Sequence, residues 1–163
     1  MGCFGKTTPI SQLKLTAGYK LIEEGAQFAV MSFDTPANEF TIHELAKWSA
    51  PANSRFKVSL PKEYPVNLVS VQVDFVRRLV LVSGNVAIGQ RWNKVFLFQY
   101  KTGALIGEFK APDGHFIAHM SFVPGGKSVL AAVKKNDGLL QTLAIYDIED
   151  KQWTQLKLPG DGA

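Results

Sequence analysis

A repeat punctuated by proline constrains this chain more than any other sequence feature. Pro61 lies 51 residues before Pro112, and Pro112 lies 47 residues before Pro159. Between these prolines the apolar segments are short, rich in Val, Ile, Phe and Tyr, and bounded by Gly, Pro, Asn or Asp, a pattern typical of strands. No stretch has the i, i+3, i+4, i+7 apolar spacing of a capped helix. The sequence therefore predicts an all-β chain.

The predicted strands fall into three groups of four with the same internal order. Each group has a strand of alternating pattern, a tight turn, a continuous apolar strand, a longer loop, a third strand, a short turn and a fourth strand. The twelve strands are expected at Ile10–Leu15, Gln27–Phe33, Glu39–Leu45, Arg55–Leu60, Leu68–Phe75, Leu79–Ser83, Lys94–Tyr100, Ala104–Lys110, Phe116–Phe122, Ser128–Lys134, Gln141–Ile148 and Trp153–Leu158.

Three four-stranded antiparallel groups at this period are typical of β-propeller blades. The repeats span residues 10–61, 66–112 and 115–159 of a single domain, 1–163. The unbroken apolar run Leu79–Val82 indicates a strand buried on both faces between neighbouring blades. The fourth strands alternate with lysine and end at proline, which protects an exposed sheet edge from pairing with other chains.

The third repeat carries residues familiar from one propeller family. Gly114-His115 opens it, Met120–Val133 covers a strand, a turn and a second strand, and Ala144-Ile-Tyr-Asp147 ends its third strand. This repeat resembles a WD-repeat blade, with Tyr146 in place of the usual Trp of the Trp-Asp pair. The resemblance implies a WD-like propeller architecture, and the first two repeats follow it by strand order alone.

Three blades are fewer than the four to eight that close a propeller. A twofold homodimer would supply six blades, and this is the preferred hypothesis. A partner protein could instead supply the missing blades, the chain could be a piece of a longer one, or the strands could form another closed or sandwiched β arrangement.

Charge and composition exclude several classes of protein. The formal net charge is +4, but Lys and Arg are scattered among acidic residues, so we expect no nucleic-acid partner. No apolar run approaches the roughly 18 residues that span a bilayer, and no secretory signal is visible. The single Cys3 fits a reducing compartment, which predicts a cytoplasmic location. Gly2 and Cys3 could in principle be lipidated, although Lys6 stands where the myristoylation motif has Ser or Thr.

No residue pattern points to catalysis. His115 and His119 would lie roughly 13 Å apart along one strand, too far to share a metal ion. The chain has no nucleophile elbow and no glycine-rich phosphate loop. We therefore expect no enzyme activity, no catalytic residue, no metal and no cofactor.

The loops on one predicted propeller face carry residue types that dominate binding hot spots. The expected partner-binding residues are Tyr64, Arg91, Trp92, Asp113, His115, Lys134, Lys135 and Asp137. For Trp92 the alternative is that its ring folds back over the blade.

These loops predict a non-enzymatic protein–protein interaction module: an adaptor, an inhibitor or immunity-type protein, or an assembly subunit. One alternative is a propeller that binds glycans or small ligands, in which Trp48, Trp92 and Trp153 stack on sugar rings. The other is a hydrolase or lactonase with its site in the channel.

Overall fold

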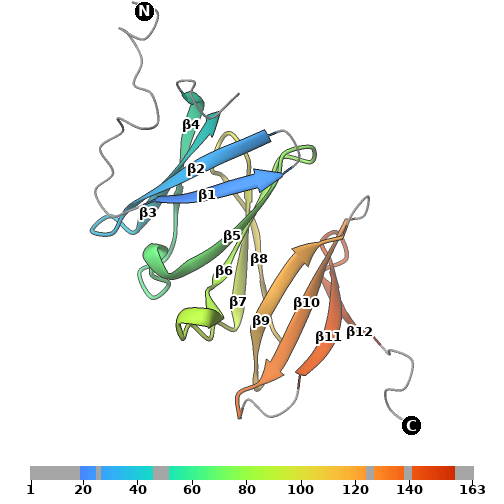
Figure 1. The fold of residues 1–163 in the computed structure, drawn as a ribbon. Coiled ribbons are helices and arrows are strands. Elements are labelled where there is room, and N and C mark those ends of the chain that lie inside the picture. The colour runs from blue at the N-terminus through green and yellow to red at the C-terminus, as the bar shows by residue number, and fades with distance from the viewer. Residues whose placement is uncertain (1–18, 25–26, 46–51, 124–126, 138–140, 157–163) are drawn as a thin grey trace, which may run out of the picture.

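The computed structural model describes residues 19–24, 27–45, 52–123, 127–137 and 141–156, and these form three antiparallel sheets (Figure 1). Each sheet is a meander of four sequence-consecutive strands, and we call the sheets blades 1, 2 and 3. Blade 1 contains β1 (Tyr19–Glu24), β2 (Gln27–Asp34), β3 (Glu39–Leu45) and β4 (Ala52–Ser59). Blade 2 contains β5 (Val69–Asp74), β6 (Leu79–Gly84), β7 (Lys94–Gln99) and β8 (Leu105–Lys110). Blade 3 contains β9 (His115–Phe122), β10 (Ser128–Lys135), β11 (Gln141–Asp147) and β12 (Gln152–Gln155).

The all-β prediction of twelve antiparallel strands in three four-stranded sheets is confirmed. The structure has one strand that was not predicted, β1. The strand expected at Ile10–Leu15 lies outside the described residues, and the first described strand is β1, which pairs directly with β2. Its sequence, Tyr-Lys-Leu-Ile-Glu-Glu, ends in two charges and gives a weak strand signal. Among the described residues, no helix is long and apolar enough to cross a membrane.

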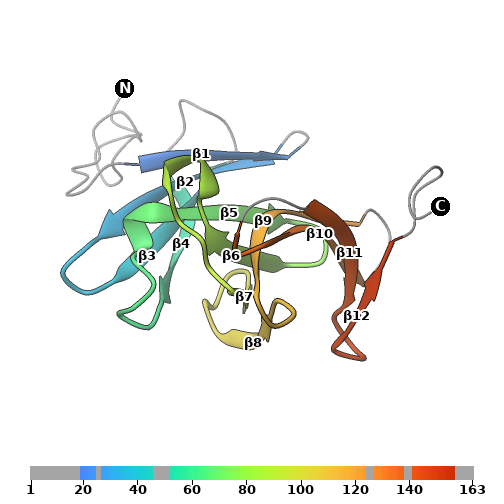
Figure 2. The ribbon, with the colours of Figure 1, turned by 90° about the horizontal axis from the view of Figure 1, so that it is seen from below.

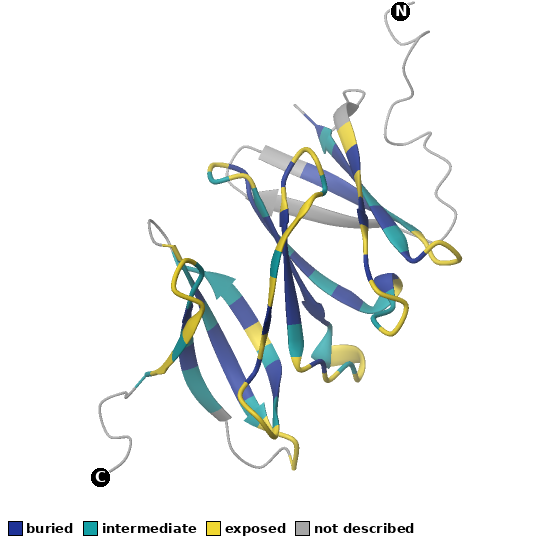
Figure 3. Cartoon of the chain, turned by 180° about the vertical axis from the view of Figure 1, so that it is seen from behind, coloured by how far each residue is buried: buried dark blue, intermediate teal, exposed yellow. Residues whose placement is uncertain are grey.

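Blade 2 lies between the other two and buries both of its faces (Figures 2 and 3). On β6, Val80 and Val82 belong to the core shared with blade 1, and Leu81 belongs to the core shared with blade 3. Because successive side chains of a strand point to opposite faces, a strand buried on both faces must be apolar at every position. This explains the unbroken run from Leu79 to Val82.

An aspartate organises one hairpin turn in each blade. Asp34, Asp74 and Asp147 each accept a hydrogen bond at Oδ1 from the backbone N–H three residues later, at 3.2, 2.9 and 2.8 Å. The residue after that donor has a left-handed φ in all three turns, of 53°, 60° and 54°. The side-chain bond fixes the turn locally, as Asp does in many tight turns. Carboxylates that look like solvated loop charges in the sequence are therefore structural.

Asn38 ends the first of these turns and ties blade 1 to the segment that leads into blade 2. Its Nδ2 donates to the carbonyls of Leu60, Pro61 and Tyr64 at 2.9–3.1 Å, and its Oδ1 accepts from Val66 N at 3.0 Å. The side chain is buried and has lost its hydrogen bonds to water. The bonds to the protein backbone replace them. One amide thus holds a chain segment that has no strand partner of its own.

Gly103 lies where the backbones of blades 1 and 2 come close together. Its φ is 73°, and a Cβ at this position would lie 1.9 Å from the carbonyl oxygen of Lys57 on β4. Gly89 has a similar φ of 89°, but a Cβ there would meet nothing within 4 Å. Substituting alanine at Gly89 would therefore cost only backbone strain, whereas at Gly103 it would cost backbone strain and a steric clash.

We predict that Gly103→Ala lowers the free energy of unfolding by at least about 2 kcal/mol more than Gly89→Ala, because only the first forces two backbones apart. Urea unfolding followed by circular dichroism measures both values. Equal losses for the two variants would show that blades 1 and 2 do not approach each other at this turn.

Arg77 of blade 2 contacts blade 3 through a hydrogen bond and a cation–π interaction. Its Nε donates to Asp74 Oδ2 at 2.5 Å, its Nη2 donates to the carbonyl of Val123 at 3.1 Å, and its guanidinium lies 5.7 Å from the centre of the Phe122 ring. Burial raises the pKa of the Asp74 carboxyl, but the hydrogen bonds and positive charge of Arg77 outweigh it, so that the pKa lies below its usual value. The charged carboxylate therefore stabilises the folded state.

We predict that this contribution is full above about pH 4, the ordinary carboxyl range, and is lost as the pH falls through the lower folded-state pKa of Asp74. Asp74→Asn should destabilise the protein at pH 7, and its difference from wild type should shrink below about pH 4. Urea unfolding at several pH values tests this, with the exposed Asp150→Asn as control. A difference that is constant with pH would contradict the assignment.

Candidate functional site

The described residues form a polar cavity of about 360 Å³ where blades 2 and 3 meet. Its walls come from the loop before β7, the turn between β8 and β9, and the turn after β10. This volume lies within the range of small-molecule pockets. The lining residues are Arg91, Asn93, Lys110, Ala111, Pro112, Asp113, Gly114, His115 and Asn136.

Backbone hydrogen bonds fix the floor of this cavity. Gly114 has a φ of 74°, which lets the chain turn so that His115 N donates to the carbonyl of Pro112 at 3.1 Å. The carbonyl of Gly114 then accepts from Asn136 N at 2.9 Å, which joins the two turns of the cavity wall. Ile117 N also donates to Trp92 O at 3.0 Å, directly between blades 2 and 3. The cavity is therefore built at a defined blade junction.

Arg91 reaches from blade 2 across to blade 3. Its guanidinium carbon lies 5.1 Å from the centre of the Phe116 ring, and its Nη1 donates to the carbonyl of Asn136 at 3.4 Å. A guanidinium has five N–H donors, and these contacts use few of them. The residue is exposed, so its remaining donors are accessible from the cavity.

His115 is held in one tautomer. Its Nδ1 lies 2.7 Å from the carbonyl oxygen of Asp113. A carbonyl can only accept, so Nδ1 carries the hydrogen and donates it. This leaves Nε2 to accept a hydrogen bond when the ring is neutral, or to donate one when the ring is protonated.

Positive charge exceeds negative charge around the cavity. Arg91 and Lys110 line it together with a single carboxylate, Asp113. Lys135 lies next to the site, because it is directly opposite His115 in the β9–β10 pair. This composition favours a ligand that carries a carboxylate or phosphate.

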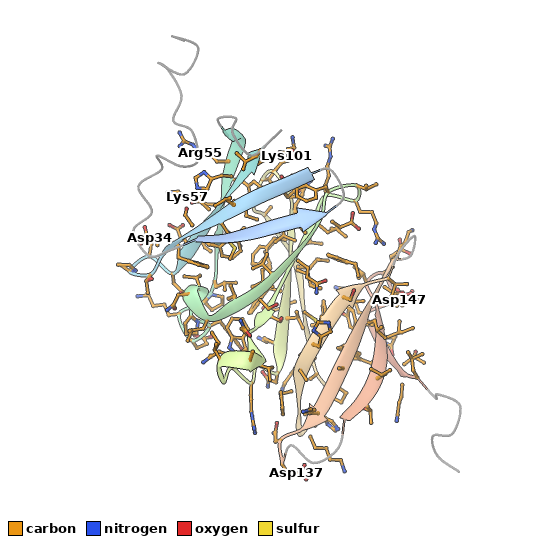
Figure 4. The ribbon with its side chains drawn as sticks, viewed as in Figure 1. Asp34, Arg55, Lys57, Lys101, Asp137 and Asp147 are labelled. Carbon is orange, nitrogen blue, oxygen red and sulfur yellow. The ribbon has the colours of Figure 1, made fainter. Side chains whose placement is uncertain are left out.

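The eight residues expected to bind a partner occupy different environments. Arg91, Asp113 and His115 line the cavity, and Lys134 and Lys135 end the neighbouring strand β10. Asp137 follows in the β10–β11 turn, at the end of blade 3 opposite Asp147 (Figure 4).

Trp92 and Tyr64 belong to the core between blades 1 and 2. Trp92 is 6% exposed, and a Cβ on Gly84 would lie 2.7 Å from its ring. The Tyr64 ring packs edge-on against Trp92 and Phe96, with centroids 4.9 and 5.0 Å away. Trp92 therefore packs in this core, which is the alternative considered for it in the sequence, and Tyr64 packs on it while staying partly exposed.

Trp153, one of the tryptophans expected to stack on sugar rings in the glycan-binding alternative, takes part in packing between blades instead. Trp153 donates from Nε1 to the carbonyl of Lys110 at 2.8 Å and packs on Tyr146 and Phe109, which joins blade 3 to blade 2. Trp48 lies outside the described residues.

Sequence reasoning missed Asn93, Lys110 and Asn136 as lining residues. The repeat pattern places Lys110 at a strand end and Asn136 in a turn of the predicted loop face, but neither was singled out as a binding residue. The remaining histidines lie elsewhere: His119 is exposed on β9, and His43 is buried on β3. Within the described part of the chain, no three His, Cys, Asp or Glu residues gather as metal ligands do.

No family model matches the chain, and no curated protein matches it at a significant level. The WD-repeat resemblance of the third repeat therefore stays a prediction. Among solved structures, the dihydro-heme d1 dehydrogenase NirN in complex with DHE is similar, with a TM-score of 0.55, 12% identity, and coverage of 89% of this chain and 29% of that one. A europium-containing methanol dehydrogenase has a TM-score of 0.49, 14% identity, and coverage of 91% and 28%.

The first of these similarities supports a propeller-like fold for the chain. The chain spans less than a third of the length of either solved protein. At such low identity the likeness concerns the fold alone.

The comparison corrects the functional expectation. The loop-based prediction was a non-enzymatic protein–protein interaction module. NirN, the solved structure whose fold the chain resembles, is a dehydrogenase, which contradicts that prediction, and this likeness offers no support for a channel-site hydrolase either.

Proposed function

We propose that this chain supplies three blades of a propeller of the dehydrogenase type, and that its inter-blade cavity binds the acidic group of a cofactor or substrate. The observation that carries the proposal is the arrangement of Arg91, Lys110 and His115 around one polar cavity with a single lining carboxylate. We assign these residues to binding and assign no proton transfer or covalent step to them.

The solved protein of similar fold was determined with a bound ligand. NirN is described as a dihydro-heme d1 dehydrogenase and was solved in complex with DHE. In the present chain, the ligand class follows from the cavity itself, because guanidinium and ammonium groups pair with carboxylates and phosphates.

Arg91 is the residue on which binding should depend most. It spans the blade junction, and its stacking on Phe116 orients the guanidinium before a ligand arrives. Pre-organisation of this kind lowers the entropic cost of binding. Because the cationic side chains are exposed, we expect the affinity to fall as salt screens them.

We predict saturable binding of citrate or inorganic phosphate at this cavity, with amide shifts at Gly114, His115 and Asn136 in heteronuclear NMR spectra. Arg91→Gln should weaken the affinity by roughly 10-fold or more, since a charge-assisted hydrogen bond contributes about 1.5–3 kcal/mol.

Lys62→Gln is the matched control, because it removes one exposed positive charge outside the cavity lining. It should leave the affinity within about twofold of wild type. Glucose, a neutral probe, should cause no saturable shift at these amides. Equal effects of the two variants, or shifts spread over all surface lysines, would contradict the proposed site.

A further inference from the structure

The cavity between blades 2 and 3 contains an acidic side chain that the binding of a simple anion does not use. Asp113 lines the cavity together with Arg91 and Lys110, but among the described residues no cation forms an ion pair with its carboxylate. The hydrogen bond with His115 involves the backbone carbonyl of Asp113. The residue is exposed, so its carboxylate oxygens are accessible to a ligand.

His115 adds a second hydrogen-bond acceptor to the same cavity. Because Nδ1 donates to the carbonyl of Asp113, the lone pair of the neutral ring is on Nε2. A fully ionised carboxylate or phosphate group has no hydrogen to donate to either acceptor. An anion without a hydroxyl group would therefore meet the repulsion of the Asp113 carboxylate and gain nothing from these two acceptors.

The cations of the cavity also lack a carboxylate partner within the described residues. Glu108, two residues before Lys110 on β8, pairs instead with Lys94 at 3.2 Å. The contact printed for the Arg91 guanidinium on blade 3 is with a neutral carbonyl, that of Asn136. The cavity thus keeps an excess of positive charge while it offers acceptors. This combination favours a ligand with net negative charge over a zwitterion.

The lining is too polar for a ligand with a large apolar body. Only Ala111 and Pro112 among the lining residues have apolar side chains, and both are small. The neighbouring Phe116 ring is buried, and the guanidinium of Arg91 lies over it. A ligand in this cavity therefore gains affinity from charge and hydrogen bonds, and an apolar ligand would leave the polar lining without partners.

We infer that the cavity binds a small hydroxycarboxylic acid, with a carboxylate on Arg91 and Lys110 and a hydroxyl group that donates to Asp113. The inference rests on the proposed acid-binding function of the same cavity and adds the class of ligand. The hydroxyl supplies the donor that a simple anion lacks. Its hydrogen bond to a charged carboxylate offsets the repulsion between that carboxylate and the ligand.

Succinate, malate and aspartate form a matched series of probes, because they share one dicarboxylate skeleton and carry a hydrogen, a hydroxyl and an ammonium group at the same carbon. At about pH 8 their carboxyl groups are all ionised. We expect the preferred enantiomer of malate to bind the wild-type chain roughly 5-fold more tightly than succinate, the effect of one added hydrogen bond. It should also bind more tightly than aspartate, whose ammonium group reduces the net negative charge. Titrations followed by amide shifts at Gly114, His115 and Asn136 measure the affinities.

Three variants assign the preference to one side chain. Asp113→Ala should bind malate and succinate within about twofold of each other, because the hydroxyl loses its acceptor. Its affinity for succinate should be at least that of the wild type, since a repulsive charge is removed. Asp150→Ala removes an exposed carboxylate outside the cavity lining and should preserve the malate preference. Arg91→Gln should weaken the binding of both acids and leave their ratio unchanged.

The outcomes separate this inference from the proposed function. Equal affinities of the wild type for succinate and malate, both weakened by Arg91→Gln, would overturn the hydroxy-acid inference and leave the acid-binding site in place. Absence of shifts at the cavity amides with either acid would contradict both. A malate preference that survives Asp113→Ala, or tighter binding of aspartate than of malate, would also refute the assignment of the hydroxyl to Asp113 and with it the inference.

Discussion

The burial of both faces of the middle sheet is the constraint on which the rest of this structure depends. Blade 2 places Val80 and Val82 in one core and Leu81 in the other. Neither neighbouring blade could bury its inner face without it, and blade 2 would expose two apolar faces without them. The three sheets are therefore stable only as a stack, and any break between them exposes apolar surface.

Polar groups determine how closely the blades approach. Asn38 holds the segment from Leu60 to Val66, and Arg77 links its own turn to Val123 at the edge of blade 3. These bonds are directional, whereas apolar packing is not, so they select one relative placement of the sheets. The cavity around Arg91 and His115 exists because that placement leaves two turns of blade 3 opposite a loop of blade 2. Binding at the cavity would thus couple to the blade junction, since a ligand that contacts both blades stabilises their contact.

The outer faces of the two end blades carry different exposed side chains. Arg55 and Lys57 are exposed on blade 1, while Leu130 and Ile145 are partly exposed on blade 3.

The strand order, the three groups of four and the doubly buried run at Leu79–Val82 could be predicted from the sequence, because strand periodicity and turn residues are local signals. Arg91, Asp113 and His115 were also identifiable as loop residues with binding chemistry. The roles of Trp92 and Tyr64 were not, since residue type alone does not separate a core aromatic from an exposed one. Asn93, Lys110 and Asn136 join the cavity through contacts between segments that are distant along the chain. The sequence by itself determined that this protein is a repeat of four-stranded antiparallel blades. Only the tertiary structure decided which charges meet at a blade junction and which aliphatic side chains of blade 3 stay partly exposed, because both depend on how whole sheets pack against one another.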